Sequence, residues 1–136
     1  MKTVFVFGTF DGVHPGHGAF LAEARALGDA LTVSVAQDQI VQRLKHHLPL
    51  KSLSERMAQV LMSEHVTKAI PGDLEIGAYH GFKLEKPELV AFGYDQIELA
   101  KDFKRFQQIT GDETPTVVLK PYRAEIYKSS LLNTKN

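Results

Sequence analysis

The 136-residue chain contains no cysteine, carries no net charge and has no long hydrophobic run. The absence of cysteine excludes disulfides, thiolate metal sites and thiol nucleophiles. Basic and acidic residues balance at 16 each, which disfavours nucleic acid as the main partner, because that role usually needs a basic surface. No apolar segment is long enough to cross a bilayer, so no membrane partner is expected. The first apolar run begins at Thr3, which leaves no room for a signal peptide, and we expect a cytoplasmic protein.

The length and composition predict a single globular domain spanning residues 1–136. Hydrophobic residues make up 43% of the chain and charged residues 24%, which is the balance of a folded protein with one ordinary core. No repeat, low-complexity tract or linker interrupts the sequence. Because a net charge of zero favours self-association, we expect a homodimer.

Apolar segments rich in β-branched residues alternate with segments of helical periodicity. The expected strands span residues 3–7, 31–36, 66–70, 89–92 and 116–120. Pro15 suits the first turn of a helix that stops at Gly28, and Ser52 with Glu55 forms a capping-box pattern before a helix whose apolar side includes residues 57 and 60–62. Further helices are expected at 39–45, within 73–86, over 97–111 with residue 109 on its apolar side, and from residue 129.

This alternation predicts an α/β fold, a Rossmann-like doubly wound five-stranded parallel sheet of strand order 3-2-1-4-5 with helices on both faces. Such sheets bind ligands beyond the carboxyl ends of their strands, where the strand order reverses. In this order the reversal lies between the first and the fourth strand. Residues 8–17 follow the first strand and residues 93–96 follow the fourth, so we expect both segments to border one cleft.

Residues 8–17, GTFDGVHPGH, contain three glycines, a proline and two histidines three residues apart. An apolar strand that ends at glycine and continues into a helix presents backbone N–H groups to a phosphate. His14 and His17, at the start of that helix, could donate hydrogen bonds to the same anion. An isolated H-x-x-H is more often a helix cap beside a surface residue. The dinucleotide-binding pattern G-x-G-x-x-G and the metal-binding pattern H-E-x-x-H are both absent.

Residues 8–11 and 14–17 together resemble the signature of the cytidylyltransferase-like nucleotidyltransferases, with its H-x-G-H core. Residues 123–130, RAEIYKSS, resemble a second motif of this family near the carboxyl end, although Ile126 stands in place of a glycine and Lys128 in place of a hydroxyl residue. Residues 93–96, GYDQ, are similar to the G-x-D stretch that borders the base pocket in the family. The resemblance covers nearly the whole chain.

The resemblance implies a role for each matching residue. His14 and His17 would bind the triphosphate and stabilise the transition state, with Lys45 and Arg123 as further catalytic cations. The nucleotide-binding residues would be Gly8, Thr9, Phe10, Gly16, Gly93, Asp95, Arg123, Ser129 and Ser130. The acceptor would be bound by Asp11, Asp38, Lys45 and Arg56. Mg²⁺ is expected as the counter-ion of the triphosphate, held by phosphates and water with no protein ligand.

Several of these assignments have a purely structural alternative. Ser129 and Ser130 would equally serve as a helix N-cap, an aspartate such as Asp38 after a strand is more often a cap, and residues 43–45 would ordinarily be a solvated face. His46 and His47 occupy the place of a second family lysine, which leaves the charge of the acceptor open.

We therefore expect an enzyme that transfers a nucleoside monophosphate from CTP or ATP to a small phosphorylated acceptor and releases pyrophosphate. The small size and the arginine-glutamate motif most resemble glycerol-3-phosphate cytidylyltransferase. The alternatives are an FAD synthase, which adenylylates FMN and which residues 93–96 resemble, and a non-catalytic nucleotide sensor. A flavin would need a broad apolar slot, for which residues 79–82 offer aromatic walls.

Overall fold

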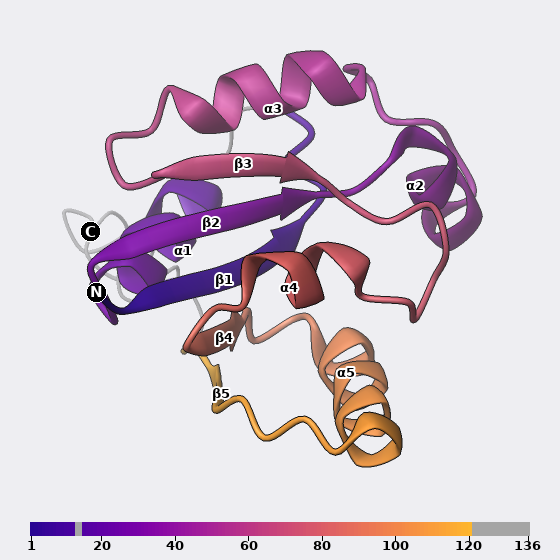
Figure 1. Cartoon of the computed structure of the whole chain (residues 1–136). Coiled ribbons are helices and arrows are strands. Elements are labelled where there is room, and N and C mark those ends of the chain that lie inside the picture. The colour runs from indigo at the N-terminus through magenta and orange to yellow at the C-terminus, as the bar shows by residue number, and fades with distance from the viewer. Residues whose placement is uncertain (13–14, 121–136) are drawn as a thin grey trace, which may run out of the picture.

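The computed structural model describes residues 1–12 and 15–120, which form a five-stranded parallel sheet flanked by helices (Figure 1). The strand order is β3-β2-β1-β4-β5, which confirms the predicted Rossmann-like topology. The strands are β1 (Thr3–Gly8), β2 (Ala30–Val35), β3 (Lys68–Pro71), β4 (Leu89–Phe92) and β5 (Thr116–Val118). The third strand begins two residues later than predicted, and the fifth ends two residues earlier.

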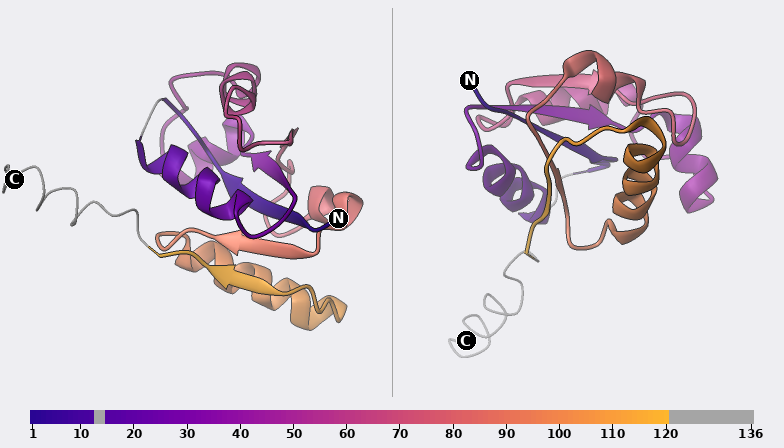
Figure 2. Two further views of the ribbon diagram at one scale, coloured as in Figure 1. Left: turned by 90° about the vertical axis from the view of Figure 1, so that its left-hand side faces the viewer. Right: turned by 60° about the horizontal axis from the view of Figure 1, so that its bottom comes forward.

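The five helices are α1 (Pro15–Arg25), α2 (Asp38–Lys45), α3 (Leu53–Leu61), α4 (His80–Glu85) and α5 (Ile97–Thr110). The capping box is present, because the Ser52 hydroxyl accepts from the Glu55 backbone N–H and the Glu55 carboxylate accepts from the Ser52 backbone N–H. Figure 2 shows α5 running beside β4 and β5 at one edge of the sheet. The helix predicted from residue 129 lies outside the described residues.

Side chains alternate between two cores along β1, the central strand. Val4 and Val6 belong to the core that α1 and α3 cover, whereas Phe5 belongs to the core under α4 and α5, with Phe7 packed against it. Because helices cover both faces of the sheet, every side of this strand is apolar, which explains its unbroken hydrophobic run.

The core under α4 and α5 is a cluster of aromatic rings, which we call the aromatic cluster: Phe5, Phe7, Tyr79, Phe82, Phe92, Phe103 and Phe106. Phe103 lies at its centre and is completely buried. Its ring meets those of Phe82 and Tyr79 nearly edge to face, at centroid distances of 5.0 and 5.1 Å. Such pairs add stability beyond the area that they bury.

Three apolar side chains predicted to face the core face solvent instead. Leu61, Met62 and Ile109 are 50%, 85% and 83% exposed. On α3 the buried positions are Arg56 and Val60, and Leu61 is turned about 100° further around the helix. On α5 the last buried side chain is Phe106, one turn before Ile109.

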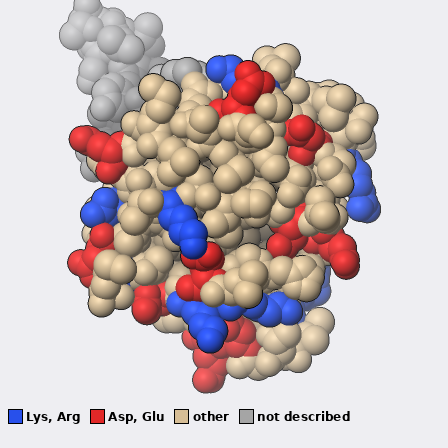
Figure 3. Space-filling view, turned by 45° about the horizontal axis from the view of Figure 1, so that its top comes forward, with Lys and Arg blue, Asp and Glu red and all other residues tan. Residues whose placement is uncertain are grey.

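Charged side chains do not gather by sign on the face that Figure 3 shows, where acidic and basic groups are interspersed around an uncharged centre. None of the helices within residues 1–12 and 15–120 is both long and apolar enough to cross a membrane.

Candidate functional site

Two cavities meet at the carboxyl edge of the sheet, where β1 and β4 end. One has a volume of about 620 Å³ and the other about 660 Å³. We call them the aromatic cavity and the polar cavity, after the side chains described below. The residues that line both are Phe7, Gly8, Thr9, Lys45, Asp95 and Gln96. A molecule in one cavity would therefore lie beside a molecule in the other.

The polar cavity is lined by the two segments that were expected to meet at the switch point. Gly16 and His17 come from the start of α1, and Gly93 and Tyr94 follow β4, with Lys120 nearby after β5. The N-terminus of a helix such as α1 favours an anion, because the helix dipole is positive there. The histidine and the lysine add further donors, so this cavity suits a phosphorylated ligand.

Phe10 gives the loop after β1 its shape. Its backbone adopts the left-handed conformation, with a φ of 54°, and its ring folds back over Gly8. A Cβ atom on Gly8 would lie 2.3 Å from that ring, so only glycine fits there. The Phe10 ring also meets the His17 imidazole nearly edge to face, at 5.4 Å between centroids. Gly8 and Phe10 therefore help to orient His17.

Gln96 joins the two strand ends at the switch point, a role that sequence analysis missed. Its side-chain Nε2 donates to the Phe7 carbonyl at 2.8 Å, and its Oε1 accepts from the Gly93 N–H at 2.8 Å. Direct pairing of β1 with β4 ends at Phe5 and Val90. The amide side chain therefore bridges the backbones of the two strands where they separate.

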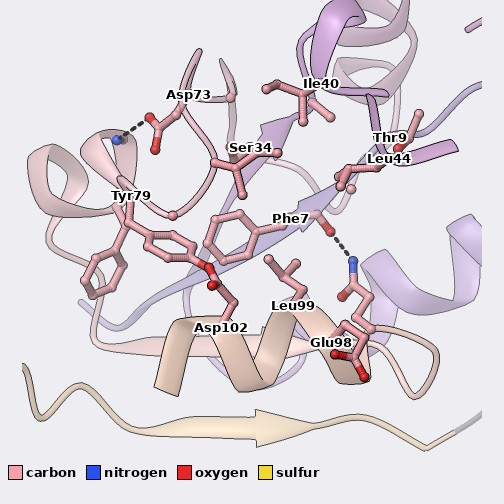
Figure 4. A pocket seen from close by; sticks show the side chains of 18 of the residues that line it. Phe7, Thr9, Ser34, Ile40, Leu44, Asp73, Tyr79, Glu98, Leu99 and Asp102 are labelled. Atoms are coloured by element: carbon pink, nitrogen blue, oxygen red, sulfur yellow. Dashed lines mark hydrogen bonds between the residues drawn. The ribbon is translucent and has the colours of Figure 1, made fainter. Parts of the chain in front are cut away.

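The aromatic cavity has a floor of rings and walls of aliphatic side chains (Figure 4). Phe7, Tyr79 and Phe82 come from the aromatic cluster, so residues 79–82 do supply aromatic walls as the sequence suggested. Around them Leu44, Ile76 and Ile97 are 63%, 48% and 59% exposed. Large apolar side chains that remain exposed around a cavity are typical of a ligand site.

Tyr79 and Asp102 form a hydrogen-bonded pair on one side of the aromatic cavity. The Tyr79 hydroxyl donates to Asp102 Oδ2 at 2.6 Å, and Arg105 Nη2 donates to Asp102 Oδ1 at 3.1 Å. Burial, followed by the bond to Asp102, raises the pKa of the Tyr79 hydroxyl far above its usual value. The hydroxyl therefore stays protonated and serves as a donor to the carboxylate.

Arg56, predicted to bind the acceptor, is completely buried. Its guanidinium donates to the carbonyls of Thr9 at 2.8 Å and Lys51 at 3.0 Å, and to Asp38 Oδ1 at 2.6 Å. Arg56 thereby joins the loop after β1, the start of α2 and the segment before α3. A direct contact between Arg56 and a ligand would require this network to open.

Asp11 also uses its carboxylate within the chain. The backbone N–H groups of Leu50 and Lys51 donate to it at 2.7 and 3.0 Å. The bond from Leu50 is the largest influence that lowers the pKa of Asp11, since it stabilises the charged form. Asp11 and Arg56 thus hold the segment between α2 and α3 from both sides, and neither they nor Asp38 line either cavity.

The structure brings together eight of the predicted site residues at the two cavities: Gly8, Thr9, Phe10, Gly16, His17, Lys45, Gly93 and Asp95. His14, Arg123, Ser129 and Ser130 lie outside the described residues. In the part of the chain that is described, no three His, Asp or Glu side chains are grouped so that they could hold a metal ion.

Four similarities connect the chain to known proteins. The family pattern described as cytidylyltransferase-like matches residues 5–133. The FAD synthase of Aciduliprofundum boonei is 37% identical over 122 residues, which cover 90% of this chain and 80% of that protein. The FAD synthase of Ferroglobus placidus is 40% identical over 96 residues, which cover 71% of this chain and 61% of that protein. The crystal structure of the lipopolysaccharide core biosynthesis protein from Thermoplasma volcanium superimposes with a TM-score of 0.79 at 29% identity, covering 90% of this chain and 98% of that one.

Proposed function

The chain belongs to the cytidylyltransferase-like family and is a nucleotidyltransferase; from that premise we propose that it adenylylates FMN to form FAD. Similarity to FAD synthases favours this reaction over the expected transfer of CMP to glycerol 3-phosphate. A phosphate oxygen of FMN would attack the α-phosphorus of ATP. The bond from that phosphorus to the bridging oxygen would break, and pyrophosphate would leave with the electron pair.

The observation that carries the proposal is the aromatic cavity. Its rings and exposed aliphatic side chains match the flat, apolar faces of a flavin, whereas glycerol 3-phosphate has no ring and would leave most of the space unfilled. Lys45 is the only cationic side chain among the described residues that line this cavity, and it also lines the polar cavity. The phosphate of FMN would lie there, beside the α-phosphate of ATP.

The polar cavity would hold the triphosphate. The N-terminus of α1, Gly16, His17 and Lys120 would bind its oxygens, joined by His14, Arg123, Ser129 and Ser130 according to the family resemblance. His17 would donate a hydrogen bond to an oxygen of the transferred group as negative charge develops in the transition state. Mg²⁺ would accompany the triphosphate as its counter-ion.

Asp11, Asp38 and Arg56 would act as positioning residues. Their hydrogen bonds fix the backbone of Thr9 and of residues 50 and 51, on either side of the cleft edge. They would thereby hold Thr9 and Lys45 at the junction of the two cavities without touching the acceptor. The expected homodimer remains a prediction.

A pyrophosphate-release assay with purified protein tests the proposal. ATP and CTP are each combined with FMN and with glycerol 3-phosphate in the presence of Mg²⁺. We expect release only with ATP and FMN, and FAD as the second product by chromatography. Release with CTP and glycerol 3-phosphate would contradict the proposal. Nucleotide binding without release in any combination would favour the sensor instead.

A further inference from the structure

Among the described residues, the aromatic cavity is lined by one cation, Lys45, and by the carboxylates of Asp73, Glu75, Asp95, Glu98 and Asp102. Thr9, Leu44 and Glu98 lie on one side of Phe7, whereas Asp73, Tyr79 and Asp102 lie on the opposite side (Figure 4). Lys45 and Asp95 also line the polar cavity, whereas Asp73 and Asp102 line the aromatic cavity alone. A ligand that extends from Lys45 toward Tyr79 therefore reaches the carboxylates of Asp73 and Asp102.

We propose that Asp102, supported by Asp73, is a specificity-determining residue that excludes a second anionic group from the far end of the acceptor. The proposal rests on the proposed function to the extent that the aromatic cavity takes the acceptor. It goes further because it sets the orientation and the chemical class of that acceptor. The enzyme would accept an aromatic monophosphate with its phosphate at Lys45 and an uncharged body in the cavity.

Both carboxylates are fixed where they are. Asp102 is held by the Tyr79 hydroxyl at 2.6 Å and by Arg105 at 3.1 Å, and its side chain is still 30% exposed. Asp73 accepts hydrogen bonds from the backbone N–H groups of His80 at 2.8 Å and Gly81 at 3.2 Å, at the start of α4. Arg105 does not itself line the cavity. These hydrogen bonds therefore hold both carboxylates in place beside the cavity.

An ionised carboxylate only accepts hydrogen bonds, so this end would bind an N–H or O–H donor and repel a phosphate or carboxylate. The apolar walls strengthen the exclusion, because an anion that enters loses water without gaining a cation. The ribityl phosphate leaves from the central ring of an isoalloxazine, and the pyrimidine ring at one of its two ends carries one N–H group. Its chemistry agrees with both ends of the cavity.

Two probes that differ only at the far end test the inference without turnover. 2-Naphthyl phosphate and 6-carboxy-2-naphthyl phosphate are titrated calorimetrically against the full chain. We expect the wild type to bind the uncharged probe at least about 5-fold more tightly, the size that two nearby like charges give in a partly exposed site. Asp102→Asn should reduce this ratio about 3-fold while keeping an acceptor for Tyr79. Asp73→Asn should reduce it in the same direction.

Glu113→Gln is the matched control, since it removes one exposed negative charge and lines neither cavity. It should leave the ratio unchanged. Equal binding of both probes by the wild type, or an unchanged ratio in both aspartate variants, would overturn the inference. If the enzyme releases pyrophosphate from FMN and ATP but the ratio of probe affinities is unchanged in both aspartate variants, only this inference fails. If the ratio responds and FMN is not a substrate, the proposed function fails and the acceptor specificity stands.

Discussion

The aromatic cavity and the polar cavity lie side by side and are nearly equal in volume, but they are built in opposite ways. The aromatic cavity takes its floor from the aromatic cluster, whose rings hold one another in place. The polar cavity takes its lining from a helix start and from the loops after β1 and β4. In the proposed function a ring would thus be recognised by the folded core, and phosphate would be bound by backbone and loop groups, from which we expect little contribution to stability.

Phe7 connects the aromatic cavity with the polar cavity. It lines both cavities, its ring belongs to the aromatic cluster, and its carbonyl accepts the bond from Gln96. A rigid residue at the junction would keep the two ligands in register, which is what transfer between two bound molecules requires. Substitutions in the two cavities should therefore differ in their effects on the free energy of unfolding and on kcat and KM.

The largest expected effect is a loss of stability from a substitution in the aromatic cluster. Phe103→Ala removes the central ring of the aromatic cluster and should lower the free energy of unfolding by about 3–5 kcal/mol. Tyr94→Ala, at a side chain that is 51% exposed and lines the polar cavity, should change it by less than about 1 kcal/mol. Urea denaturation measures both. Similar losses in the two variants would contradict the division of roles.

The next largest expected effect is a fall in kcat from a substitution in the polar cavity. His17→Ala should lower kcat about 10²–10³-fold, because a donor to developing charge is lost, and should leave the KM for FMN within about 2-fold. Steady-state pyrophosphate release measures both constants. His80→Ala replaces an exposed histidine that lines neither cavity and should behave as the wild type. A rise in the KM for FMN as large as the fall in kcat would place His17 in the acceptor site.

A smaller effect is expected where the cavities meet. Lys45→Met removes the cation that lines both, and should raise the KM for ATP and the KM for FMN about 10-fold each. Lys104→Met, which removes an exposed charge from α5 outside both cavities, is the control. If only one of the two KM values changes, Lys45 binds only that ligand, and the claim that both ligands contact Lys45 is contradicted.

The smallest effect tests the support of the cleft edge. Asp11→Asn should lower the free energy of unfolding by about 0.5 kcal/mol at pH 7, because Asp11 is only partly buried and loses the charge that strengthens its two hydrogen bonds. The pKa of Asp11 is lowered below its ordinary value of 3.8, so folding favours its charged form. Its contribution is therefore present above that value and is lost as the pH falls through the lowered pKa. Urea denaturation from pH 7 to pH 3 should show wild type and variant converging, and a constant difference would contradict the account.

The sequence predicted the topology because strand and helix periodicities alternate clearly, and it placed the cleft because residues 8–17 and 93–96 follow the two strands at the switch point. It also identified the capping box at Ser52. These features are local or follow from general rules of parallel sheets.

The sequence could not predict features that depend on distant partners. Arg56 was expected to bind the acceptor, but its partners include backbone carbonyls 5 and 47 residues away, which no side-chain pattern reveals. Tyr79 and Asp102 pair across 23 residues, and Gln96 reaches a carbonyl 89 residues earlier. Of these contacts, only the one between Gln96 and the Gly93 N–H could have been suspected from the sequence, because the two residues are three positions apart.

The central claim is that the two cavities bind different substrates, and binding without turnover tests it most directly. FMN binding is followed by flavin fluorescence and ATP binding by calorimetry, in His17→Ala and in Ile97→Glu, which places a carboxylate at the exposed mouth of the aromatic cavity. The account predicts that His17→Ala weakens only ATP binding and that Ile97→Glu weakens only FMN binding, by about 10-fold. Loss of both ligands in either variant, or weakening of the opposite one, would contradict it.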